Sequence, residues 1–388
     1  MTYKSKKQSR KPRILIIAPS CRFGITGIGL CVESMLDGFR ERGHDTTHSD
    51  TSIKLQGSII GKWKLSKALR QATMLVPALF RIIRSDIVYI TLASSRFGAL
   101  RDWCLISFSA LLRKRTVGHL HGGGFRSMYE ESAPLLQKRF RRAIGKLAAV
   151  IVLTPSLRSQ FEGLARAGSI LVISNGIAAP LSESRINAKV ISPRKAPFKL
   201  LFLSNLIKSK GYCEAIAGTL VARELTGADI EIVLAGEMIE VESDMRGSSK
   251  NPIDCFSNES VTYVGAVSGK QKQDLLNQAH VLILPTYYPW EGQPLCIIEA
   301  MACGIPVIST KHKGIPELAE DGLEAILLDA AETNAIATAI VSLAGDEERY
   351  RRMSRAARAR FLKDYSLEVY LDRLETALFG QQASVRQD

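Results

Sequence analysis

The chain has 388 residues, of which 46% are hydrophobic, and a formal net charge of +14. This length exceeds a single ordinary hydrophobic core and predicts two domains of about two hundred residues each. Apolar runs such as ILIIAP, AAVIVL and HVLILP are far shorter than the roughly 20 residues of a membrane-spanning helix, so they predict buried strands. Seven scattered cysteines without CxxC spacing predict neither a zinc site nor a disulfide framework. No secretion signal is visible, and we expect a cytoplasmic protein.

The first half of the chain alternates short apolar runs with amphipathic segments of helical length, which is typical of a parallel sheet built from βαβ units. Its expected strands are RILIIAP (13–19), DIVYITLA (86–93), RTVGHLHG (115–122), AAVIVLTP (148–155) and ILVISNG (170–176). The second half repeats the pattern with KLLFLSNL (199–206), DIEIVLAG (229–236), VTYVGAV (261–267), HVLILPTY (280–287) and IPVIST (305–310). From Glu332 onward we expect helices, the last of them capped by Ser366. The sequence therefore predicts an α/β fold with two doubly wound domains, 1–195 and 196–365, that face each other across a cleft.

Positive charge is concentrated in the first half of the chain. Residues 1–195 contain 33 lysines and arginines against 11 acidic residues, whereas residues 196–388 contain 19 against 27. Within the segment GKWKLSKALRQATMLVPALFRIIR, Lys62, Lys64 and Lys67 alternate with apolar side chains, as in a helix that lies on an anionic membrane. The basic stretches 113–115 and 138–146 add to this charge. We expect an anionic membrane surface as a partner, with solvated helix faces as the plain alternative. Nothing such as zinc-finger spacing or an aromatic RNP motif favours nucleic acid.

Two glycine-rich loops follow strands of the first half. The loop CRFGITGIGL carries Gly24, Gly27 and Gly29. It leads into a helix and lets the backbone approach a phosphate, although it lacks the G-x-G-x-x-G spacing of a dinucleotide fingerprint. In the other loop, His121 precedes the glycines 122–124 at the carboxyl end of a strand, where a ligand can lie against the backbone. We expect His119 to point to the opposite face of this strand and to be structural.

The first strand of the second half ends in a basic loop. FLSNLIKSKGY carries Lys208 and Lys210 between a strand and a helix, at the crevice expected between the two domains. Lysine at this point can neutralise a departing diphosphate. Two exposed lysines near a helix start can also be merely solubilising.

Two glutamates lie at either end of the segment EGQPLCIIEA. Glu291 follows the apolar run HVLILPTYYP in a loop, and Glu299 lies in an apolar helix whose first turn begins near Pro294. The first backbone N–H groups of that helix, on Leu295 and Cys296, favour an anion such as a diphosphate. An unpaired carboxylate in an apolar helix is costly, so Glu299 needs partners, and ligand hydroxyls would serve.

The segment EGQPLCIIEAMACGIPVIST, with seven residues between its two glutamates, resembles the signature of the retaining family-4 glycosyltransferases (glycosyl transferases group 1) with the GT-B fold. The resemblance implies that Glu299 binds the donor ribose. It also implies that Glu291 and the backbone after it hold the transferred sugar, which assigns donor contacts to Gly292, Gln293, Pro294, Leu295 and Cys296.

The same resemblance extends to other positions. It implies that His121 lies at the donor sugar, Lys210 at the diphosphate, Gly265 near the nucleotide base, and the loop of Gly24 beside the diphosphate and the acceptor. Asn205 stands where the family has an arginine, so Lys208 is expected to supply the missing charge. The resemblance further implies a terminal helix, 366–388, that packs back on the first domain.

We therefore expect a retaining glycosyltransferase that moves a hexose-type sugar from a nucleotide diphosphate donor, with UDP as the expected nucleotide. The expected acceptor is a hydroxyl of a lipid-linked saccharide in cell-surface polysaccharide assembly, at the inner face of the cytoplasmic membrane. No metal or other cofactor is expected, because the chain has no Asp-x-Asp motif. Retention could use Glu291 as a nucleophile or front-face attack assisted by the leaving phosphate. A nucleotide-sugar epimerase of the same fold, a non-catalytic nucleotide- or lipid-binding protein and a dinucleotide oxidoreductase are the alternatives.

Overall fold

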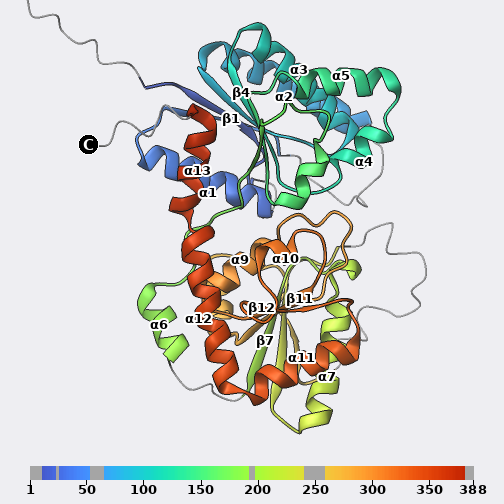
Figure 1. The fold of residues 1–388 in the computed structure, drawn as a ribbon, viewed down its shortest axis with the longest axis vertical. Helices are drawn as coiled ribbons and strands as arrows, with labels where there is room; N and C mark the ends of the chain where they lie inside the picture. The colour runs from blue at the N-terminus through green and yellow to red at the C-terminus, as the bar shows by residue number, and fades with distance from the viewer. Residues whose placement is uncertain (1–10, 23–25, 53–64, 192–196, 240–257, 381–388) are drawn as a thin grey trace, which may run out of the picture.

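The computed structural model describes residues 11–22, 26–52, 65–191, 197–239 and 258–380. For residues 65–72 and 189–191 it describes the backbone alone. Two parallel six-stranded sheets, each flanked by helices, lie one above the other in Figure 1. This arrangement confirms the predicted α/β fold with two doubly wound sheets.

The N-terminal domain is built on a sheet with the strand order β2-β1-β3-β4-β5-β6. Its strands are β1 (Ile14–Ala18), β2 (Thr46–Asp50), β3 (Ile87–Thr91), β4 (Arg115–Leu120), β5 (Ala149–Val152) and β6 (Ile170–Val172). Every residue of β1, β3 and β5 is buried, because helices cover both faces of the sheet. The sequence did not predict β2, an edge strand of sequence TTHSD with no apolar run.

Helices cover the two faces of this sheet unequally. Its helical elements are α1 (Gly27–Glu41), α2 (Leu65–Arg84), α3 (Arg96–Leu111), α4 (Phe125–Glu130), α5 (Pro134–Ile144) and the 3-10 helix η1 (Pro155–Gln160). One core cluster joins α2, α3 and α5 to one face, and a second joins α1 and the C-terminal helix α13 (Leu367–Phe379) to the other. Helix α13 therefore completes the N-terminal domain although it lies at the far end of the chain (Figure 1).

The C-terminal domain is built on a sheet with the strand order β12-β11-β10-β7-β8-β9. Its strands are β7 (Phe198–Leu203), β8 (Ile230–Ala235), β9 (Val261–Tyr263), β10 (Val281–Leu284), β11 (Val307–Thr310) and β12 (Ala325–Leu328). Its helices are α6 (Glu183–Ile191), η2 (Lys208–Lys210), α7 (Tyr212–Thr226), α8 (Gly269–Gln278), α9 (Leu295–Ala302), α10 (Ile315–Leu318), α11 (Thr333–Gly345) and α12 (Glu347–Asp364). Counted from β7, this is the doubly wound order 6-5-4-1-2-3, whose switch point lies between β7 and β10. The second unpredicted strand, β12, is again an edge strand.

The chain passes between the two domains twice, at neighbouring points. The first crossing follows β6, and the second joins α12 to α13. They touch where the backbone N–H of Ile177 donates to the carbonyl of Tyr365, at 3.0 Å, and where Ile177 bridges Ser366. After the first crossing, Ile177, Leu181 and Ile186 already pack into the core of the C-terminal domain, so α6 packs with that domain although it precedes residue 196.

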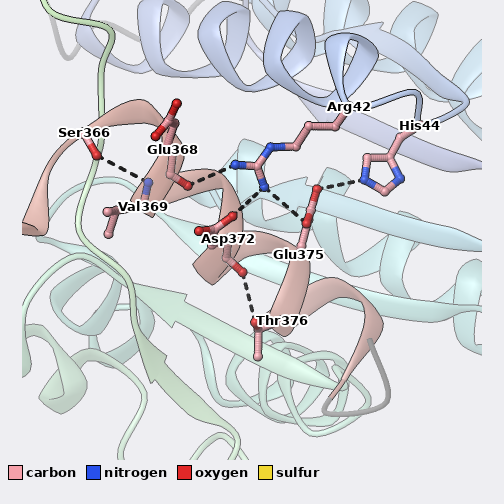
Figure 2. Close-up of polar contacts among 8 residues, drawn as sticks. All are labelled: Arg42, His44, Ser366, Glu368, Val369, Asp372, Glu375 and Thr376. Carbon is pink, nitrogen blue, oxygen red and sulfur yellow. Dashed lines mark hydrogen bonds and ion pairs between the residues drawn. The ribbon is translucent and has the colours of Figure 1, made fainter. Parts of the chain in front are cut away.

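A polar clasp holds α13 against the N-terminal domain (Figure 2). Arg42, just after α1, lies 2.7 Å from an oxygen of Asp372 and 3.2 Å from one of Glu375, and His44 lies 2.8 Å from the other Glu375 oxygen. The hydroxyl of Ser366 accepts from the backbone N–H of Val369, which confirms the expected N-cap. The clasp joins residues more than 320 positions apart in the chain.

Candidate active site

The switch point of the C-terminal sheet carries a buried ion pair. Loops after β7 and β10 bring Lys210 and Glu291 together, and the Lys210 ammonium donates to Glu291 Oε2 at 2.6 Å. The two side chains are 14% and 7% exposed. Thr286 donates to the same oxygen at 3.3 Å, and the ammonium lies 4.9 Å from the ring centroid of Tyr288. Ligands of open α/β sheets bind at such switch points, beyond the carboxyl ends of the strands.

Glycine 211 lets the two loops come this close. Gly211 has a φ of +83° and follows Lys210 directly, and a Cβ placed on it would lie 2.2 Å from the carbonyl oxygen of Pro285. A side chain there would therefore push the two loops apart. The glycine thus allows the close approach of the loops that carry the lysine and the carboxylate.

A second buried ion pair lies on the neighbouring helices. Glu299, in the apolar helix α9, is 8% exposed, and its Oε1 accepts from the ammonium of Lys272 on α8 at 2.6 Å. Glu299 therefore has a partner, as expected, but this partner is Lys272, which was not among the predicted site residues. Twenty-seven residues separate the two, and no local spacing connects them. Each of the two glutamates is thus matched by one lysine.

Helix α9 begins beside these pairs. Pro294 is its N-cap residue, and Leu295 and Cys296 form its first turn. The first N–H groups of a helix have no acceptor within it and carry the positive end of its dipole. Burial raises the pKa of the Cys296 thiol to about 12, so this side chain is uncharged at neutral pH. The helix start therefore adds positive potential to the site.

His121 enters from the N-terminal domain as part of a buried aromatic cluster. The Tyr89 hydroxyl lies 3.1 Å from Nε2 of His121 and 2.7 Å from Nδ1 of His119. The two imidazole rings stack at 3.9 Å with an interplanar angle of 28°. The prediction that His119 points to the opposite strand face is wrong, because residues two apart lie on the same face of a strand.

Burial keeps both imidazoles neutral. It lowers the pKa of His121 to about 4. Burial also lowers the pKa of His119 well below its ordinary value, and the repulsion that a protonated His121 would exert lowers it further. The Tyr89 hydroxyl has one proton, so at least one of the two rings must donate to it. Nδ1 of His121 is buried and has no hydrogen-bond partner of good geometry among the described residues, although the Asn175 side chain is near enough to raise the pKa of the ring slightly against burial.

The predicted residues of the two domains meet directly. We call the contact of residues 121–124 with residues 290–292 the interdomain seam. A Cβ placed on Gly292 would lie 2.8 Å from the Cα of Gly122 and 3.0 Å from the carbonyl oxygen of His121. Gln293 also reaches across, because its Oε1 accepts from the backbone N–H of Asn175 at 2.7 Å. Glycine at 292 is what allows the two backbones to touch.

Further contacts continue the join between the domains. Glu317, on α10, accepts from the backbone N–H and the hydroxyl of Ser156 at 2.9 and 3.0 Å. A Cβ on Gly27 would lie 3.3 Å from Cδ1 of Leu295, so the start of α1 faces the start of α9. Gly29 donates its N–H to the hydroxyl of Thr26, the N-cap of α1. Gly24, of the same loop, lies outside the described residues.

Three further residues predicted to contact the donor take no part in the two ion pairs. Asn205 is exposed, and its Oδ1 accepts from the backbone N–H of Glu237 at 3.3 Å. Lys208 is half-buried at the start of η2. Gly265 has a φ of +72°, which favours glycine, and its carbonyl accepts from the N–H of Gly236 at 2.8 Å. The amide oxygen of Asn205 thus bonds the backbone, and its side chain carries no positive charge with which to replace an arginine.

The basic segments of the first half fall partly outside the described residues. Lys62 and Lys64 lie there, and only the backbone of Lys67 is described. Arg115 of the run 113–115 donates to the carbonyls of Leu378 and Ala377 at the end of α13, so it serves the fold. Among the helices that the structure describes, none combines the length and apolar character needed to cross a membrane.

Comparison with known proteins finds a family profile that matches most of the C-terminal half of this chain. Residues 184–360 match the sequence profile described as glycosyl transferases group 1. The chain is 26% identical over 194 residues to the amylovoran biosynthesis glycosyltransferase AmsK of Erwinia amylovora, covering 49% of this chain and 46% of that protein. It is 28% identical over 199 residues to a glycogen synthase of Mycobacterium tuberculosis, covering 50% and 45%. The chain thus matches less than half of the length of these relatives.

Solved structures share the fold over nearly the whole chain. The crystal structure of HepE from Anabaena in complex with UDP and glucose superposes with a TM-score of 0.68 at 17% identity, over 95% of this chain and 99% of that one. A glycosyltransferase from Rickettsia africae superposes with a TM-score of 0.69 at 14% identity, over 96% and 99%. The fold is therefore GT-B, and residues 184–360, which carry Lys210, Glu291 and Glu299, match the glycosyl transferases group 1 family.

Proposed function

We propose that this protein is a retaining glycosyltransferase that transfers a hexose-type sugar from a UDP-sugar to an acceptor hydroxyl without a metal ion. The observation that carries the proposal is the pair of buried carboxylate–lysine contacts, Glu291–Lys210 and Glu299–Lys272, opposite the His121 loop. The UDP complex of the similar HepE supports the choice of nucleotide.

The chemistry follows from the positions of these charges. Cleavage of the donor leaves a diphosphate anion while positive charge develops on the sugar, so catalysis requires fixed positive charge at the phosphates. Lys210, Lys208 and the start of α9 supply it in this proposal. Glu299 accepts from the ribose hydroxyls, and Glu291 faces the sugar, either to position it or to attack its anomeric carbon. His121 lies at the donor sugar in this proposal.

Release of nucleoside diphosphate tests this function. The purified protein would be incubated with UDP-glucose, UDP-galactose, UDP-N-acetylglucosamine and GDP-mannose, and the free UDP or GDP would be measured. We expect release from one UDP-sugar and its loss in Glu299→Gln and Lys210→Met. Lys199→Met is the matched control, because Lys199 lies at the opposite, amino end of β7 and bonds the amide of Gln278. No release from any donor, or equal release by the Glu299 variant, refutes the proposal.

We further propose that the acceptor is a lipid-linked saccharide and that the protein docks on the inner face of the cytoplasmic membrane. The name of AmsK, an amylovoran biosynthesis glycosyltransferase, supports an acceptor of polysaccharide assembly. On α2, Val76, Phe80 and Ile83 are 57%, 62% and 51% exposed at helical spacing, so they form one apolar stripe. Exposed basic side chains of α5 lie on the same side of the sheet. Such a stripe beside positive charge suits an anionic bilayer.

Sedimentation with vesicles tests the membrane surface. Vesicles of phosphatidylcholine with phosphatidylglycerol would be compared with pure phosphatidylcholine. We expect binding to the anionic vesicles only, weakened by Phe80→Asp and by neutralising Lys62, Lys64 and Lys67. Leu225→Asp is the control, since Leu225 is equally exposed, at 68%, on α7 of the C-terminal domain. Equal binding by the Phe80 variant and the wild type overturns this part of the proposal.

A further inference from the structure

Trp290 is an exposed aromatic side chain next to the most buried part of the candidate site. Its side chain is 51% exposed, whereas Glu291, Gly292 and Gln293, which follow it, are all buried. The indole therefore offers exposed apolar surface next to the candidate site, where a ligand can cover it. The mechanism described above does not use this residue.

Contacts along the interdomain seam place Trp290 at its outer end. Gly292 lies against His121 and Gly122, at the inner end where the imidazole is buried. A Cβ on Gly123 would lie 3.6 Å from the carbonyl oxygen of Glu291, and one on Gly124 would lie 2.7 Å from Cε3 of the Trp290 ring. A Cβ on Gly122 would lie 3.7 Å from the carbonyl oxygen of Trp290, so the two loops pack closely along their whole contact, with the indole against Gly124.

Gly124 fixes one side of the indole. It has a φ of +96° and no side chain, so Cε3 and Cζ3 of Trp290 approach its backbone closely. The hydroxyl of Ser94, which is exposed, lies beside this contact and donates to the carbonyl of Gly123 at 3.3 Å. The ring is thus held from the glycine loop, with an adjacent hydroxyl and half of its surface open.

We propose that Trp290 is a stacking platform for a pyranose ring of the acceptor saccharide. The inference rests on the proposed function and names the class of acceptor. One face of a pyranose presents C–H groups with partial positive charge, and the face of an indole is negative, so the two stack. The sugar hydroxyls at the ring edge remain free to bond polar neighbours such as Ser94.

The acceptor fits this position better than the donor does. Glu291 turns towards Lys210 and the C-terminal sheet, where the proposed donor phosphates lie. Trp290 turns the other way, onto the N-terminal domain. A saccharide that reaches the donor sugar from solvent along the seam would pass over the indole first.

Tryptophan fluorescence tests the platform without knowledge of the natural acceptor. The probes are the methyl pyranosides of glucose, galactose, mannose and N-acetylglucosamine, with glucitol as an open-chain polyol that has no pyranose face. In the presence of UDP, we expect at least one pyranoside to change the emission and glucitol not to. The change should be absent in Trp290→Ala and in Trp290→Phe, which lack the indole. A change that persists in Trp290→Ala, or none with any pyranoside, overturns the proposal.

Turnover supplies a second readout. With the pyranoside as acceptor, Trp290→Ala should raise its apparent KM about tenfold, and by more than any change in the donor KM, while Trp290→Phe should restore most of the loss. Gly124→Ala should raise the same KM by displacing the ring. Gly163→Ala is the control for backbone strain, because Gly163 has a φ of +72° and nothing within 4 Å of a Cβ placed on it.

An unchanged KM for the pyranoside in Trp290→Ala, with UDP release intact, overturns the platform and leaves the proposed function standing. If the wild-type protein releases no UDP at all, the proposed function itself is refuted.

Discussion

Removal of the Lys210 ammonium should destabilise the C-terminal domain through Glu291. At the 2.6 Å separation of the two charged atoms, Coulomb attraction at an effective dielectric constant of 20 is about 6 kcal/mol before desolvation is counted. Lys210→Met removes the attraction and leaves a carboxylate that is 7% exposed without its cation. Loss of one partner of a buried pair costs about 3–5 kcal/mol. Because Lys210 is still 14% exposed, we take the lower end, about 3 kcal/mol.

Calorimetric melting of the wild type and four variants tests this value. For a domain of this size, about 3 kcal/mol corresponds to a fall of about 6–12 °C in melting temperature. Glu291→Gln should lower it too, whereas the double variant Lys210→Met/Glu291→Gln should lose about 1–3 kcal/mol less than the sum of the two. Lys199→Met, the control, should leave the melting temperature unchanged. If the two single effects add without coupling, the two groups do not form a pair in solution and the reasoning fails.

Four other changes follow from the structure. Lys272→Met leaves Glu299 without its cation, so UDP affinity by calorimetric titration should fall about tenfold, or about 1.4 kcal/mol. His121 has a folded pKa of about 4 against an ordinary value of 6.5. Its neutral form therefore stabilises the fold fully above pH 6.5, and about 3 kcal/mol is lost as the pH falls towards 4. Urea titrations should show this loss, reduced in His121→Asn. Arg42→Ala removes the clasp on α13 and should lower stability by about 1 kcal/mol, less at high salt. Gly292→Ala places a methyl group 2.8 Å from a backbone atom, so sugar transfer should be lost while UDP still binds.

Each of these expectations has a contrary result. UDP affinity unchanged by Lys272→Met would remove Lys272 from the donor site. If the free energy of unfolding falls between pH 6.5 and 4 by the same amount in His121→Asn as in the wild type, the acid sensitivity belongs to other groups. Salt-independent stability in both Arg42→Ala and the wild type would show that the clasp contributes by packing alone. Full activity of Gly292→Ala would mean that the domains do not need the close backbone contact seen at the seam.

The sequence predicted most of the fold because buried parallel strands are continuous apolar runs. The two strands that it did not predict, β2 and β12, are both edge strands, which pack on fewer neighbours. TTHSD shows no apolar pattern at all, and its place is decided by pairing with β1. Pairing of this kind is not visible in local composition.

Within the site, the sequence predicted the residues but not their partners. Glu291 and Lys210 are 81 positions apart, and the strand order that makes them neighbours follows from the doubly wound topology. Lys272 carries no motif of its own, so its pairing with Glu299 could not be found by spacing. The error on His119 was one of periodicity, since the alternation along a strand places His119 and His121 on one side. Trp290 gave no signal, because only its position at the seam shows that it is exposed beside buried neighbours.

The neighbouring crossings of Ile177 and Ser366 determine how the two halves can move. Both covalent links lie at one place, so a rotation about that place stretches neither of them and needs only small torsional changes in a few residues. A sliding motion would pull the two links against each other and break the contact between them. We therefore expect the two domains to open by a hinge rotation about this place, so that Trp290 and Gly124 separate while residues 177 and 366 stay together.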